Sequence, residues 1–204
     1  LHELDNNYID LNVADLKFQG EMSWKVIDGL DIGVLSALRY NSSAYEHHIK
    51  DHSNQAKAYR AGIDPEDATI RENNPLLYTD PSDSQALPVS ILPKGGIYNR
   101  TAITMRGVDV RLSATYNKTF QNTHIVNLYA GMESNNTERT RTWFRGWGYQ
   151  YDNGGNPYSY YMVFKQGQEE GTSYYTSQST ISRFASFFGQ ATYSYKGRYT
   201  LNTG

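Results

Sequence analysis

The sequence has no cysteine, no long apolar run and no marked excess of charge of either sign. Without cysteine, the chain has neither disulfides nor thiolate metal ligands. Its longest unbroken apolar run, Tyr160 to Phe164, is far shorter than the roughly 20 residues that a membrane-spanning helix needs. The 19 basic and 21 acidic residues are mixed along the chain. They offer no basic surface, so we expect no nucleic-acid partner.

The chain is instead rich in tyrosine. It has 18 tyrosines, and aromatic residues make up 14% of it although hydrophobic residues as a whole reach only 38%. A disordered chain would be poor in aromatic residues, so the composition indicates a folded protein. Tyrosine together with many glycine, asparagine, serine and threonine residues is typical of β-strands joined by polar loops.

Apolar and polar residues alternate over six stretches, which is the pattern of strands with one apolar face. The first stretch runs from Leu16 to Val26 and the second from Leu30 to Asn41, with Asp28-Gly29 between them as a hairpin turn. The other predicted strands are 108–117, 126–133, 186–195 and a short one from Tyr199 to Leu201. The sequence therefore predicts an all-β, antiparallel protein.

The connections between these strands favour a membrane barrel. Very short turns alternate with two long links, at about residues 43–100 and 136–179. Loops beyond roughly 12–15 residues are uncommon in compact domains, whereas transmembrane barrels have short turns on one side of the membrane and long loops on the other. An open sheet of six strands would leave unpaired edges in lipid, so such a piece needs the rest of its barrel. We predict that residues 1–204 are a fragment of an antiparallel transmembrane β-barrel.

Several aromatic residues on the apolar face lie near the ends of the predicted strands. Transmembrane barrels carry aromatic girdles at both membrane interfaces. We predict lipid-interface positions for Trp24, Tyr40, Tyr116, Tyr193, Tyr195 and Tyr199. Tyrosine and tryptophan are also good strand formers in a sandwich core, so a soluble, secreted all-β module that binds carbohydrate is the alternative.

The chain also resembles the SusC/RagA family of TonB-dependent outer-membrane transporters, which is typical of Bacteroidetes. The resemblance lies in five collinear segments: NNYIDLNVADLKFQGEMSWKVIDGLDIG (6–33), EHHIKDHSNQAKAYRAG (46–62), NNPLLYTDP (73–81), LPKGGIY (92–98) and SFFGQATYSYKGRYTLN (186–202). It implies a 22-stranded barrel in the outer membrane, of which this chain supplies about six strands without the plug domain. The family imports glycans or peptides together with a SusD-like lipoprotein, using the TonB system through parts of the protein outside this chain.

A stretch dense in aromatic rings lies in the second long link. On an extracellular loop such rings, with neighbouring arginines, are suited to contact with a ligand or a partner protein. The candidate contact residues are Trp143, Arg145, Trp147, Tyr149, Tyr151, Tyr158, Tyr160 and Tyr161. A long loop also needs a small core of its own, and the same rings could form it.

No motif indicates catalysis or a cofactor. His48 and His52 have a spacing that suits a metal, but the zinc-protease arrangement His-Glu-x-x-His is absent and a polar loop is the simpler interpretation. The segment 152–156 is rich in oxygen ligands for Ca²⁺ but reads better as a turn. The chain has no phosphate-binding glycine loop and no nucleophile elbow. We therefore expect no enzyme, no resident metal and no cofactor.

Overall fold

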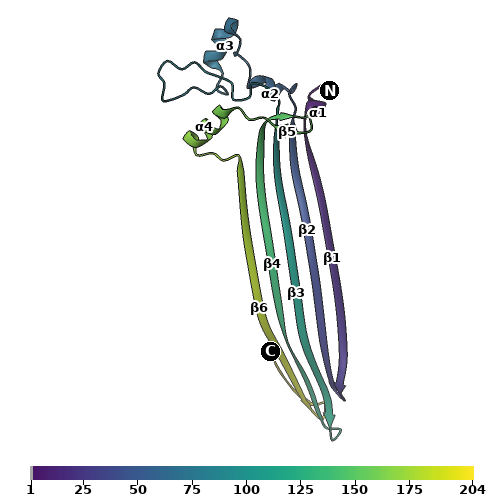
Figure 1. The fold of residues 1–204 in the computed structure, drawn as a ribbon. Coiled ribbons are helices and arrows are strands. Elements are labelled where there is room, and N and C mark those ends of the chain that lie inside the picture. Colours follow the sequence, from purple (N-terminus) through teal and green to yellow (C-terminus); the bar gives the residue numbers. More distant parts are fainter. Residues whose placement is uncertain (1) are drawn as a thin grey trace. The chain divides into compact units, whose positions relative to one another are not determined.

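The computed structural model describes residues 2–204 and consists mainly of long antiparallel strands (Figure 1). Five strands have 20 to 27 residues each: β1 (Asn7–Ile27), β2 (Leu30–Ile49), β3 (Gly96–Phe120), β4 (His124–Gln150) and β6 (Tyr175–Tyr195). Their order in the sheet follows the chain, β1-β2-β3-β4-β6-β7. The short strand β5 (Asn156–Pro157) pairs with β4, and β7 (Tyr199–Thr203) pairs with β6. The sheet is not closed.

The helices are short. They are α1 (His2–Asn6), α2 (Asn54–Ala58), the 3-10 helix η1 (Pro65–Asp67), α3 (Ala68–Asn73) and α4 (Tyr161–Glu170). Within residues 2–204, none of them is long and apolar enough to cross a membrane.

The chain divides into two compact units. Unit 1 contains residues up to Val13, Ser43–Ile103 and Arg141–Gln178, and therefore holds all the helices. Unit 2 contains Ala14–Ser42, Thr104–Thr140 and Ser179–Gly204, and consists of strands and the tight turns between them.

The tight turns of unit 2 confirm the predicted strand pairs. β1 ends at Ile27 and β2 begins at Leu30, on either side of Asp28-Gly29. Gly29 has φ +90°, and a Cβ there would collide with the carbonyl oxygen of Asn117, so the position requires glycine. The link between β3 and β4 turns through two further residues with positive φ, Gln121 at 51° and Asn122 at 49°.

The strands extend further than the alternation predicts, which corrects the boundaries of both long links. β2 continues to Ile49 and β3 begins at Gly96, so the first link is residues 50–95. β4 continues to Gln150 and β6 begins at Tyr175, so the second is residues 151–174. On β4 the sequence hides the extension because the stretch 134–142 is polar at every position. Strand pairing there depends on backbone hydrogen bonds and shows no alternation of apolar residues.

One face of unit 2 carries a network of charged and polar groups. The Arg39 guanidinium pairs with Asp15 at 2.7 Å, across β2 and β1. Arg111 on β3 pairs with Glu133 on β4 at 2.7 Å, and Glu133 accepts a hydrogen bond of 3.2 Å from Ser186 on β6. Exposed pairs of this kind contribute little free energy. They do oppose a register shift by one residue, because such a shift would carry each side chain to the other face.

The opposite face of unit 2 is apolar and uncovered. Four β1 side chains on this face are between half and three-quarters exposed: Leu16 at 52%, Phe18 at 69%, Met22 at 72% and Trp24 at 65%. Phe187 on β6 is 80% exposed. No other segment among residues 2–204 packs over these side chains. Exposed apolar surface of this kind is typical of a face that contacts another protein or a membrane.

On the charged face, Phe188 fills the space above Gly131. The Phe188 ring lies tilted against that of Tyr129, with centroids 5.4 Å apart, and the Arg111 guanidinium lies 6.0 Å from the centre of the Phe188 ring. A Cβ on Gly131 would overlap the Phe188 ring and would lie 2.6 Å from the carbonyl oxygen of Leu112. Glycine at position 131 therefore leaves room for the Phe188 ring of β6 beside β4.

Substituting Gly131→Ala should destabilise the folded full-length protein by about 1–3 kcal/mol, because neither the ring nor the Leu112 backbone can easily move. The loss is measured as a lower temperature for the folded-to-unfolded mobility shift on a detergent gel. Gly189→Ala is the matched control. Its Cβ would have the carbonyl oxygen of Tyr129 as its nearest neighbour, at 3.8 Å, so the temperature should stay near that of the wild type. An equal fall in both variants would contradict the packing described.

Candidate ligand-binding cleft

Unit 1 has a small hydrophobic core of its own. The buried residues of this core are Ile49, Ala56, Tyr78, Ile91, Leu92, Ile97, Trp147 and Val163. They come from strand ends, from both long links and from helices α2 and α4. The core therefore fixes the two links against the ends of the strands and gives unit 1 a defined surface.

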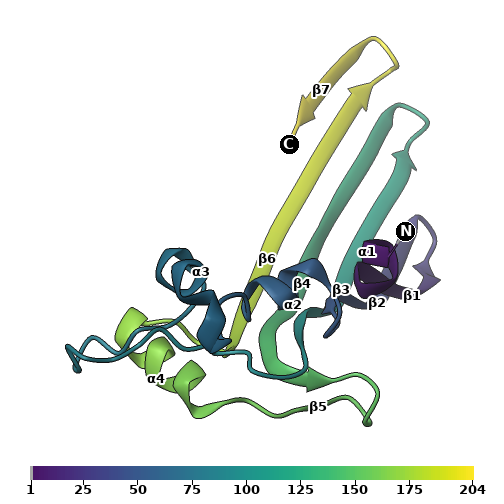
Figure 2. The ribbon, with the colours of Figure 1, turned by 90° about the horizontal axis from the view of Figure 1, so that it is seen from above.

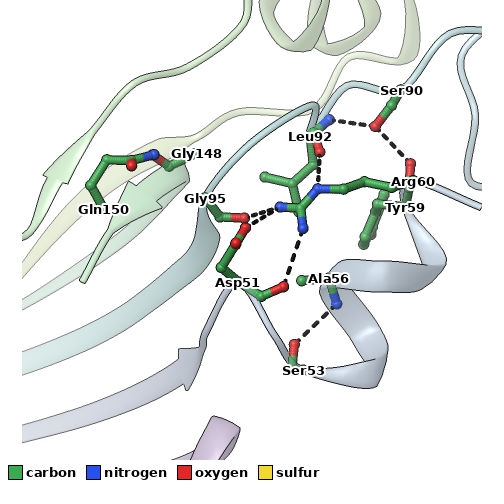
Figure 3. Close-up of polar contacts among 10 residues, drawn as sticks. All are labelled: Asp51, Ser53, Ala56, Tyr59, Arg60, Ser90, Leu92, Gly95, Gly148 and Gln150. Atoms are coloured by element: carbon green, nitrogen blue, oxygen red, sulfur yellow. Dashed lines mark hydrogen bonds and ion pairs between the residues drawn. The ribbon is translucent and has the colours of Figure 1, made fainter. Parts of the chain in front are cut away.

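Arg60 holds the first link in shape (Figure 3). Its Nε donates to the carbonyl of Leu92 at 2.9 Å, and its Nη1 to the carbonyl of Asp51 at 3.1 Å. Nη2 donates to the carbonyl of Gly95 and forms an ion pair of 2.6 Å with the Asp51 carboxylate. Only 18% of the Arg60 side chain is exposed. One guanidinium thus satisfies three loop carbonyls that would otherwise lack partners.

A cleft of about 790 Å³ opens on unit 1. One wall comes from the first link and includes Leu76 and Ile91. The other wall is α4 and the residues that follow it, with Phe164 the largest apolar side chain on the helix. Figure 2 shows α4 beside the segment that carries α3. The remaining lining residues include Trp143, Arg145 and Trp147, which alternate along β4 and so share one face of that strand.

Arg145 lies between the two tryptophans. Its guanidinium carbon is 5.4 Å from the centre of the Trp143 ring and 5.5 Å from that of Trp147, within the range of cation–π attraction. Its Nε donates to the side-chain oxygen of Asn99 at 2.7 Å. Among residues 2–204, no carboxylate comes within 4.0 Å of this guanidinium. Two rings and Asn99 therefore hold the arginine in place, without a carboxylate beside it.

The charge of Arg145 contributes to a lowered pKa at the neighbouring His47. Burial lowers the pKa of His47 below its usual value, and the positive charges of His48 and Arg145 lower it further. The Nε2 of His47 lies 2.6 Å from the side-chain oxygen of Asn7. Burial is the main cause of the lowered pKa of His47, and Arg145 is the smallest of the three causes.

Polar contacts join the two walls of the cleft. The Tyr78 hydroxyl donates to Glu169 on α4 at 2.6 Å. Lys165, also on α4, forms an ion pair with Asp80 in the first link. Hydrogen bonds from Lys165 and Ser82 lower the pKa of the Asp80 carboxyl from 3.8 to about 2. We call these two contacts the latch. Tyr78 and Glu169 are separated by 91 positions in the chain, and Asp80 and Lys165 by 85.

Three of the eight predicted contact residues lie in the cleft, namely Trp143, Arg145 and Trp147. Trp147 is only 8% exposed and belongs mainly to the core. The exposed rings of Tyr158 and Tyr161 lie outside the cleft lining, and Tyr160 packs edge-on against Tyr161 with centroids 4.8 Å apart.

Tyr149 and Tyr151 belong to a separate aromatic cluster. The Tyr149 ring stacks on Tyr98 at 4.8 Å, and Tyr151 donates from its hydroxyl to the carbonyl of Ile97 at 2.9 Å. His48 packs beside Tyr151 at 5.8 Å, among rings of the same cluster. These side chains join the ends of strands, which favours the core interpretation of the ring-dense stretch for them.

The predicted interface aromatics occupy the strands of unit 2. Trp24 is 65% exposed and Tyr199 is 72% exposed; Tyr40 and Tyr193 are each 40% exposed, and Tyr116 and Tyr195 are half-buried. Tyr193 lies with its hydroxyl 2.6 Å from Nδ1 of His124, beside the turn between β3 and β4. Their role at a lipid surface remains a prediction.

Sequence reasoning did not identify the two walls of the cleft. The residues it missed are Tyr59, Leu76, Ile91, Phe164 and Tyr174. Phe164 stands in the ring-dense stretch and could have been included on that ground. The others come from links without periodicity, where only the three-dimensional structure shows which side chains meet.

The metal candidates take structural positions. The backbone carbonyl of His52 accepts from His2 at 3.1 Å, and His48 packs among rings. The segment 151–155 forms turns, with Gly154 and Gly155 both at φ +70°. Within residues 2–204, no three histidine, aspartate or glutamate side chains gather into a group that could hold a metal ion.

The fold matches that of solved structures. Two matches are "Structure of the RagAB peptide transporter", with a TM-score of 0.53, and "Structure of the RagAB peptide importer in the 'closed-closed' state", with a TM-score of 0.54. Each is 13% identical in sequence and covers 97% of this chain. The chain has the fold of part of the RagA barrel. This confirms the predicted fold class.

The match with RagA extends over only a small part of that protein. This chain spans 18% of the matched chain in the first structure and 17% in the second. No family model matches the sequence. No curated protein is similar to it in sequence. At this identity the likeness to RagA is one of fold.

The latch should open in acid. The folded-state pKa of Asp80 is depressed, so the ion pair stabilises the cleft at any pH above 3.8 and the effect is lost as the pH falls through about 2. The rate at which pepsin cleaves link 50–95 should therefore rise between pH 4 and pH 2. The rate is divided by that for an unstructured peptide, which corrects for the pH dependence of pepsin itself.

Lys165→Met should be cleaved quickly at both pH values, because Asp80 then has no cation. Lys57→Met changes an exposed lysine with no ion pair and should keep the wild-type pH step. The same cleavage rate in wild type and Lys165→Met at pH 4 would show that the latch does not hold the link.

Proposed function

We propose that this chain is a segment of the barrel of a TonB-dependent outer-membrane importer. The observation that carries the proposal is the uncovered apolar face of unit 2, which lies opposite a charged face on the same strands. A sheet with one apolar and one polar face suits a barrel wall between lipid and a watery interior. The fold of the RagA barrel supports the same conclusion.

The height of the apolar face suits a bilayer. On β3 the outward apolar positions run from Val108 to Tyr116, which is nine residues, and a tilted transmembrane strand needs about 9–11. The next residue of β3 on this face after Val108 is Arg106. Arg106 and Glu138 of β4 both line a hollow of about 260 Å³. Charges on the lipid side would be costly, so lipid contact ends before these residues.

The soluble alternative, a secreted carbohydrate-binding module, requires a second layer over the apolar face. Sandwich proteins bury this face against another sheet. Leu16, Phe18 and Trp24 are each more than half exposed, and the helices belong to the other unit. A soluble protein with these side chains in water would aggregate. The alternative therefore has less support than the barrel.

We further propose that unit 1 lies outside the membrane, where it contacts the substrate or a SusD-like lipoprotein. Its surface offers a defined cleft, and the exposed rings of Tyr158 and Tyr161 are of the kind that protein interfaces favour. The substrate class expected from the resemblance is a glycan or a peptide. Coupling to TonB would use parts of the protein outside this chain.

Substituting Leu112→Lys in the full-length protein should cost roughly 2–4 kcal/mol if the side chain faces mid-bilayer lipid. We expect less folded protein in the outer-membrane fraction and slower uptake of substrate by growing cells. Thr115→Lys is the matched control, because it places the same charge on the polar face of the same strand. If Leu112→Lys were tolerated as well as Thr115→Lys, the barrel proposal would fail.

A further inference from the structure

The terminal nitrogens of Arg145 are the most evident unused binding groups in unit 1. Asn99 takes up Nε, and the two indole rings hold the flat guanidinium. Within residues 2–204, no hydrogen bond or ion pair engages Nη1 or Nη2, although the side chain lines the cleft. A guanidinium held on two rings, with one edge free, is prepared for a planar anion such as a carboxylate.

We propose that the cleft beside Arg145 binds the carboxylate end of a short peptide whose last residues are apolar. This proposal deepens the proposed function, because it names the ligand chemistry of unit 1 and rests on that unit being open to the outside. The carboxylate pairs with the free edge of Arg145, and the neighbouring apolar side chain lies against the walls.

The walls of the cleft suit an apolar side chain next to the carboxylate. Phe164 and Tyr174 meet edge to face with centroids 5.3 Å apart and remain 42% and 52% exposed. Leu76 lines the opposite wall and is 37% exposed. These surfaces lose contact with water when an aliphatic side chain enters, and each buried methylene contributes about 0.8 kcal/mol of favourable transfer.

Polar groups in the same cleft suit a peptide backbone. Gln166 and Gln168 supply amide groups, and Thr172 and Ser173 supply hydroxyls. A fatty acid would bury these groups without hydrogen-bond partners, which is costly. The Glu170 carboxylate also lines the cleft, but it accepts from Gln166 at 2.7 Å and forms no ion pair with Arg145.

A sugar acid fits this cleft less well. Sugars bind to proteins by stacking on exposed aromatic faces. The two indoles already face Arg145, and Trp147 is only 8% exposed. The two tryptophans therefore leave little ring surface for stacking, and the exposed rings of Phe164 and Tyr174 pack edge to face against each other.

Calorimetry on the purified full-length protein in detergent tests the proposal, with N-acetyl-Gly-Leu-Leu and its C-terminal amide as probes. The acid should bind, and the amide should bind about 10–100-fold more weakly, because a charge-assisted hydrogen-bond pair is lost. Arg145→Met should lower the affinity for the peptide acid to that of the amide. Arg145→Lys, which keeps the charge without the fork, should lie between the two.

Arg141→Met is the matched control, since Arg141 is an exposed arginine of β4 that does not line the cleft; it should bind like the wild type. Equal binding of acid and amide by the wild type would overturn the proposal without reliance on any variant. So would Arg145-dependent binding of a glucuronic-acid disaccharide with no binding of the peptide. Neither result depends on membrane insertion, so failure here leaves the Leu112→Lys test of the barrel unaffected.

Discussion

The constraint on which the rest of the structure depends is that its strands must satisfy two different environments at once. In unit 2 every long strand presents apolar side chains to one side and charged or polar side chains to the other. Backbone groups within such a sheet are satisfied by neighbouring strands, which is the condition for a sheet in lipid. Two ion pairs, Arg39–Asp15 and Arg111–Glu133, and the hydrogen bond from Ser186 to Glu133 oppose a register shift that would carry apolar side chains to the other face.

Unit 1 combines strand ends with the two long links, and together they pack a core of their own. Arg60 organises the first link through carbonyl contacts, and the latch fixes α4 against it. The cleft lies between the two links. It lies beside β4, which carries Arg145, and its two walls are joined by the latch.

The features that could be predicted from the sequence are those that follow from the alternation of apolar and polar residues. Alternation located all six strands of unit 2 and the Asp28-Gly29 turn. It left Trp143, Arg145 and Trp147 in the second long link, whereas the structure places them on β4. It did not locate the ends of β2, β3, β4 and β6. On β4 the cause is the stretch 134–142, which is polar at every position and therefore has no period. Nor could the sequence pair Asp80 with Lys165, since links without regular structure leave such contacts to tertiary packing.

The central claim is that unit 2 lies in the outer membrane with unit 1 outside the cell. The most direct measurement labels single cysteines, placed in a cysteine-free full-length protein, with a membrane-impermeant maleimide on intact cells. The account predicts that a cysteine at Gln168 reacts at once, one at Asn122 reacts only after the outer membrane is opened, and one at Leu112 does not react. Labelling at Asn122 but not at Gln168, or free labelling at Leu112 in intact cells, would contradict it.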